Sequence, residues 1–118
     1  MTDYKTYYGI LDNGQLRNGF AYTSIRELLE NVSEAIIDVT DDPQIIEIST
    51  AADTLDKHLT ILYIHGFEPC KIPMYVAEEI KQHPSAVVSM DSQYFYDGSM
   101  YGIQGLSTEE IVEILEGN

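Results

Sequence analysis

Basic residues are scarce in this sequence, and tryptophan is missing altogether. The chain of 118 residues has 6 Lys and Arg against 20 Asp and Glu, which gives a formal net charge of −14 with histidine neutral. Such a surface repels nucleic-acid phosphates and anionic membranes, so direct binding to either is not expected. It attracts a basic partner over a screening length of about 8–10 Å. Solubility alone is the other explanation of this charge.

Cysteine and long apolar runs are also lacking. Cys70 is the one cysteine, so no internal disulfide forms, which fits a reducing compartment. The longest nearly apolar run, Leu59–Ile64, is far shorter than the roughly 20 residues of a transmembrane helix. The N-terminal MTDYKTYYG does not resemble a signal peptide. With 44% hydrophobic residues, we expect one cytoplasmic globular domain spanning 1–118.

The three histidines form no recognised catalytic or metal-binding pattern. His58 and His65 would share a helix face, and Cys70 follows five residues later. Zinc sites need three or four convergent ligands in closely spaced pairs, and no such pairs occur here. No helix N-terminus precedes Cys70 to lower the pKa of its thiol. We predict no metal, no cofactor and no catalytic residue, with Cys70 a buried structural thiol. A small enzyme using these three side chains is an alternative that a shared cleft would support.

Residues 4–23 (YKTYYGILDNGQLRNGFAYT) predict a β-hairpin. Asn13-Gly14 favours a type I′ turn, because both central residues of that turn have positive φ. Folding the segment about this turn pairs Leu11 with Leu16 and Tyr7 with Phe20. The predicted core face then consists of Tyr7, Leu11, Leu16, Phe20 and Tyr22, and the opposite face of Tyr4, Tyr8, Ile10 and Arg17.

Ser24–Val39 predicts an amphipathic helix. Thr23 or Ser24 can cap it, and Glu27 lies three residues after Ser24, as in a capping box. At about 100° per residue, one arc carries the apolar residues Ile25, Leu28, Leu29, Val32, Ala35, Ile36 and Val39. The opposite arc carries Glu27, Glu30, Glu34 and Asp38.

Most of the remaining chain also divides into short elements. We expect strands at Gln44–Thr50 and Ala86–Met90, helices at Asp53–His65, Met74–Gln82 and Ser107–Glu116, and a second hairpin at Gln93–Gln104. A strand within 53–65 is the alternative to the second helix. Residues 4–39 and residues 93–116 each have the pattern of a hairpin followed by a capped helix. A duplication of one ancestral segment would explain this similarity, and chance recurrence of a common motif is the alternative. The predicted fold is a compact α+β single domain, in which two β-hairpins plus short strands form a mostly antiparallel sheet packed by three to four helices.

The acidic arc of the first predicted helix is the first candidate binding surface. Eleven residues of helix rise roughly 16 Å, so its four carboxylates recur about every 4.5–6 Å. One DNA strand carries a phosphate about every 3.4 Å. The predicted row consists of Glu27, Glu30, Glu34 and Asp38, and Asp41 and Asp42 continue it. A merely solvated helix face is the alternative interpretation.

Tyrosines form the second candidate surface. Folding 93–104 about Asp97-Gly98 places Tyr94, Tyr96 and Tyr101 on one face. If the opposite face packs inward, these tyrosines are exposed and supply rigid contact area to a partner. If the tyrosine face packs inward, they are core.

These two surfaces favour a non-enzymatic acidic inhibitor that binds a basic protein. We hypothesise that it occupies the nucleic-acid-binding surface of a nuclease or defence protein by imitating nucleic-acid charge. Phage anti-CRISPR and anti-restriction proteins are analogous in physical type only. The alternatives are an immunity protein or antitoxin that neutralises a basic toxin, an acidic structural or assembly subunit, and the small enzyme above. The sequence leaves the oligomeric state open, a homodimer included.

Overall fold

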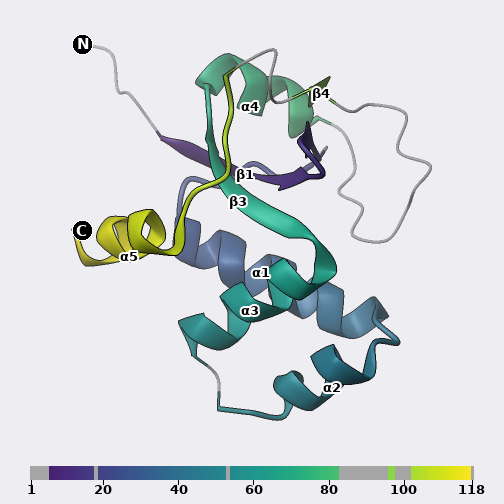
Figure 1. The fold of residues 1–118 in the computed structure, drawn as a ribbon. Helices are drawn as coiled ribbons and strands as arrows, with labels where there is room; N and C mark the ends of the chain where they lie inside the picture. The colour runs from purple at the N-terminus through teal and green to yellow at the C-terminus, as the bar shows by residue number, and fades with distance from the viewer. Residues whose placement is uncertain (1–5, 18, 53, 83–95, 98–101, 118) are drawn as a thin grey trace.

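A four-stranded antiparallel sheet lies at the centre of the computed structural model, which describes residues 6–17, 19–52, 54–82, 96–97 and 102–117. Its strand order is β3 (Phe67–Ile72), β1 (Tyr7–Asp12), β2 (Gln15–Leu16) and β4 (Tyr96–Asp97). The described helices are α1 (Ile25–Val39), α2 (Pro43–Ser49), α3 (Leu55–His65), α4 (Met74–Ile80) and α5 (Thr108–Glu116). The α+β prediction is therefore confirmed, with one helix more than the three to four expected (Figure 1).

The first hairpin forms as predicted at its turn and departs from the prediction further on. Asn13 and Gly14 have φ of 55° and 81°, and Leu11 pairs with Leu16. The ladder ends after β2, because Gly19 turns the chain with φ of 84° and donates its N–H to the Ile80 carbonyl. Tyr8 then bridges Tyr22 instead of Tyr7 pairing with Phe20, so that part of the predicted register is wrong.

Both faces of β1 are buried, which a one-sided hairpin would not require. The first core cluster packs Tyr8, Ile10 and Phe20 against α1 and α3. The second packs Leu11 and Leu16 against α4. Assigning Phe20 and Tyr22 to the face of Leu11 is therefore wrong, because both pack in or against the first cluster. In Figure 1 the sheet accordingly lies between α4 on one side and α1 with α3 on the other.

Helix α1 confirms the clearest prediction from the sequence. The Ser24 hydroxyl accepts the backbone N–H of Glu27 at 3.3 Å, which caps the helix. Its buried residues are Ile25, Leu28, Leu29, Val32, Ser33 and Ile36. Val39 is the exception to the predicted core arc, because it ends the helix and is 50% exposed.

Helix α2 occupies the segment for which a strand was predicted, and that prediction is wrong. Asp42 caps it by accepting the Gln44 N–H at 2.8 Å, and Pro43 lies in its first turn. Proline at this position begins a helix well, because its fixed φ is helical and its missing N–H is not needed there. Ile45 is buried in the first cluster, so tertiary packing outweighs the β preference of the isoleucines.

The remaining described elements mostly follow their sequence signals. Helix α3 ends at Gly66, which has φ of 95°, so the helix predicted for this segment is confirmed and its strand alternative is wrong. Pro73 precedes α4 as its N-cap. Ser107 and Glu110 form a capping box at the start of α5, within the predicted helix Ser107–Glu116. Within the described ranges, no helix is long and apolar enough to cross a membrane.

Two predictions lie wholly or partly outside the described residues. The strand Ala86–Met90 is one of them. The second hairpin is described only at Tyr96–Asp97, which pairs with β2, and at 102–104. The similarity between 4–39 and 93–116 stays a prediction for the same reason.

Candidate protein-binding surface on helix α1

The outer face of α1 carries the predicted carboxylate row, and all four members are exposed to solvent. They are Glu27, Glu30, Glu34 and Asp38. Spacings of three, four and four residues place successive members one above the other on the helix surface. Among the ion pairs between described residues, none includes a member of this row. The row is therefore a line of negative charge that is not neutralised by the protein's described cations.

This arrangement opposes the stability of the helix that carries it. Glu30 and Glu34, and likewise Glu34 and Asp38, are like charges four residues apart, each pair costing about 0.2–0.5 kcal/mol. Asp38 also lies in the last turn, where the helix dipole favours cations, and that turn has no basic residue. Interspersed lysines would keep the protein soluble without these costs. The row is thus not explained by helix stability.

Two basic side chains outside α1 contact other parts of the protein. Arg17 is buried, lies 2.9 Å from the Asp12 carboxylate and stacks over Phe67. Lys57 donates from Nζ to the Ala51 carbonyl at 3.2 Å. These contacts hold positive charge at the hairpin and at the start of α3.

On α1 itself the one basic residue is the exposed Arg26, which lies four residues before Glu30. The ion pairs between described residues do not include it. From Glu27 to Asp38 the charged residues are all acidic.

The two aspartates after α1 have different roles. Asp41 is exposed and extends the row beyond the helix end. Asp42 is half-buried, and its carboxylate accepts the Gln44 N–H. Asp42 therefore has a structural function in starting α2, whatever it contributes to binding.

Two exposed apolar side chains follow the row along the chain, and the sequence interpretation missed both. Val39 is 50% exposed and Ile46 is 49% exposed. Val39 was assigned to the apolar arc of the first predicted helix and Ile46 to the predicted strand Gln44–Thr50. Recognising Pro43–Ser49 as a helix identifies the exposure of Ile46, because successive helix residues point in different directions and Ile45 takes the buried position. Protein interfaces combine exposed apolar area of this kind with polar and charged groups at the rim.

The tyrosine surface is not placed by the structure. Tyr94 and Tyr101 lie outside the described residues, and of Tyr96 only the backbone in β4 is described. Whether these side chains are exposed stays a prediction. The candidate surface therefore rests on α1 and the start of α2.

The side chains suggested for an enzyme are separated. His58 is buried and its Nδ1 contacts the Ser33 hydroxyl, between α3 and α1. The ring of His65 lies edge-on to Phe67 at 4.6 Å between centroids. Cys70 is buried in the second core cluster, where burial raises the pKa of its thiol to about 12. These three groups do not share a cleft.

The described residues also lack a cluster that would hold a metal. No group of three or more His, Cys, Asp or Glu is suitably placed among them.

Comparison of the chain with protein-family models, with curated proteins and with solved structures found no match. Inferences about function therefore rest on the chemistry of the surface.

Proposed function

We propose that this protein is a non-enzymatic inhibitor whose α1 surface binds the basic nucleic-acid-binding surface of a nuclease or defence protein. The observation that carries the proposal is the exposed row of like charges on α1, which lacks ion pairs among the described residues. A partner that supplies arginines and lysines would relieve the repulsion within the row. Binding would then recover free energy that the isolated helix lacks.

The dimensions of the row suit a surface built for phosphates. Four carboxylates along roughly 16 Å of helix lie about 4.5–6 Å apart, of the same order as the roughly 3.4 Å per phosphate of a nucleic-acid strand. Complementary charge of this kind accelerates association and excludes partners with acidic surfaces. Val39 and Ile46 would supply the apolar contact that charge alone does not provide.

Charge reversal with a matched control tests the proposal. The test variant carries Glu27→Lys, Glu30→Lys and Glu34→Lys. The control carries Glu78→Lys, Glu79→Lys and Glu113→Lys, three exposed positions on α4 and α5. Both variants change the net charge equally. Wild-type protein is used to capture partners from host lysate at low and at high salt, and the affinity of each variant for a captured basic protein is then measured.

We expect the α1 variant to bind at least about a hundredfold more weakly and the control variant within a few-fold of wild type. Binding should weaken at high salt, and a nucleic-acid duplex should compete with the protein. Equal losses for both variants would show that net charge alone acts. Failure of the duplex to compete would instead favour a partner such as a basic toxin.

A further inference from the structure

The sequence contains two Asn-Gly pairs, Asn13-Gly14 and Asn18-Gly19. In this dipeptide the backbone nitrogen of the glycine can attack the side-chain amide of the asparagine, because glycine has no Cβ to obstruct the approach. Since the two pairs are the same dipeptide, the sequence alone does not rank their reactivity. The structure distinguishes them by what the attacking nitrogen contacts.

The nitrogen of Gly14 is open to such an attack. Asn13 and Gly14 are exposed at the tip of the first hairpin, between β1 and β2. Among the described residues, no hydrogen bond uses the N–H of Gly14. Apart from the two chain neighbours of Gly14, no heavy atom lies within 4 Å of the position that a Cβ would take there. A local opening of the turn can therefore bring this nitrogen to the Asn13 side chain while the core stays packed.

The nitrogen of Gly19 is engaged in a tertiary contact. Gly19 is half-buried, and its N–H donates to the carbonyl of Ile80 at 2.9 Å. Ile80 belongs to α4 and is fully buried in the second core cluster. An attack by the Gly19 nitrogen therefore requires the loss of this hydrogen bond. Asn18 itself lies outside the described residues, so the comparison concerns the two glycine nitrogens.

We propose that Asn13 is a site of spontaneous deamidation and isoaspartate formation, and that the Asn18-Gly19 pair is protected in the folded protein. The Gly14 nitrogen bonds to Cγ of Asn13 and gives up its proton, and Nδ2 leaves as ammonia, which closes a succinimide ring. One water molecule then breaks the bond from this nitrogen to one of the two ring carbonyls. Cleavage at Cγ gives aspartate, and cleavage at the backbone carbonyl gives isoaspartate. The reaction needs only water and is independent of the proposed protein partner.

The two products differ in how they fit the hairpin. Aspartate retains the main chain, and Asp-Gly favours the same type I′ turn as Asn-Gly. Isoaspartate adds one methylene to the main chain of a two-residue turn in which Asn13 has φ of 55°, so the turn geometry that matches the strand twist is lost. Leu11 and Leu16 pair beside this turn and are both buried in the second core cluster. Isoaspartate should therefore destabilise the fold, whereas aspartate should change its stability little.

Reaction rates at the two pairs test the proposed site. The full chain is incubated in mildly alkaline buffer, folded and in parallel unfolded in urea, and both pairs are followed by peptide mapping with mass spectrometry. Each folded rate is divided by the rate of the same asparagine in urea, which removes differences of local sequence. We expect this ratio to be about three- to tenfold higher for Asn13 than for Asn18, the factor that one hydrogen bond provides. Equal ratios, a higher ratio for Asn18, or no product at Asn13 in the folded protein would overturn the proposal.

The stability of the isoaspartate form tests the difference between the products. Asn13→Asp is the matched control, because it has the added charge without the added main-chain atom. The isoaspartate form is separated from the aspartate form by chromatography, and it is unfolded in urea beside the control and the wild type. We expect the control to unfold at a midpoint close to that of wild type and the isoaspartate form at a lower one. Equal midpoints for the isoaspartate form and the control would contradict the proposed effect on the hairpin.

Discussion

The Ser33 hydroxyl oxygen lies 2.5 Å from Nδ1 of His58, inside the contact between α1 and α3. The same hydroxyl is 3.0 Å from the Glu30 carbonyl, to which it donates. A hydroxyl has one proton, so while it donates to Glu30, Nδ1 of His58 must carry the proton and donate to Ser33. Both side chains are buried, Ser33 fully. The pair is therefore a structural link that sets how α1 lies on α3, and with it the direction of the acidic face.

Removing the serine hydroxyl should destabilise the fold. Ser33→Ala deprives the buried Nδ1 of this partner, and we expect the free energy of unfolding to fall by about 1–3 kcal/mol. Urea denaturation followed by circular dichroism measures it. Ser49→Ala is the control, because its hydroxyl also donates to a helix carbonyl but lies at the surface. The control should change stability by less than about 0.5 kcal/mol. Equal effects would show that the link to His58 contributes nothing.

A single charge reversal on α1 should stabilise the protein and weaken partner binding at once. Glu34→Lys replaces two repulsive spacings, with Glu30 and with Asp38, by two attractive ones. We expect the free energy of unfolding to rise by about 0.5–1.5 kcal/mol at low salt, and by less at 1 M salt. Thermal and urea unfolding measure the first effect and partner affinity the second. A variant that loses both stability and binding would contradict a binding role for the row.

Local signals in the sequence were sufficient for several elements. Asn13-Gly14 determines the first turn, Ser24 the start of α1, and Gly66 the end of α3. Each depends on a few adjacent residues and on backbone chemistry that distant contacts do not change. The exposure of the carboxylate row also follows from the 3.6-residue period of α1.

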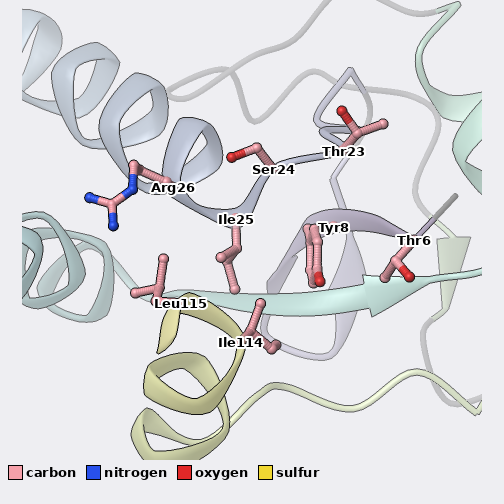
Figure 2. A pocket seen from close by; sticks show the side chains of 8 residues that line it. All are labelled: Thr6, Tyr8, Thr23, Ser24, Ile25, Arg26, Ile114 and Leu115. Carbon is pink, nitrogen blue, oxygen red and sulfur yellow. The ribbon is translucent and has the colours of Figure 1, made fainter. Parts of the chain in front are cut away.

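Features that depend on distant packing were not predictable in this way. The isoleucines of α2 favour a strand locally, and burial of Ile45 decides otherwise. The short β2 depends on the hydrogen bond from Gly19 to Ile80, more than sixty residues away in sequence. A pocket lies where β1, the start of α1 and α5 meet, and it unites residues near 8, 25 and 114, which no linear pattern connects (Figure 2). Exposure of Val39 and Ile46 required knowledge of where α1 ends and that α2 is a helix.

Gly9 should not tolerate a side chain, although its backbone needs no special φ. A Cβ at this position would lie 3.0 Å from the Phe20 carbonyl oxygen and 3.3 Å from Cδ1 of Ile72. We expect Gly9→Ala to lower the free energy of unfolding by about 1–3 kcal/mol. Adding Ile72→Val removes the side-chain contact but not the backbone one, so the double variant should not regain stability. Full recovery in urea denaturation would assign the strain to Ile72 instead.

Cys70 should make the fold sensitive to alkali. Burial raises the pKa of its thiol from an ordinary value near 9 to about 12, so the folded state disfavours the thiolate. The stability from this group is fully present below pH 9 and is lost between pH 9 and 12, at roughly 1 kcal/mol per pH unit at most. Burial also raises the pKa of Tyr8 and Tyr22, which act in the same direction. Cys70→Ala retains both tyrosines, so its stability should fall less steeply over this range than that of wild type. In urea denaturation at stepped pH, identical slopes for the two proteins would exclude this role of Cys70.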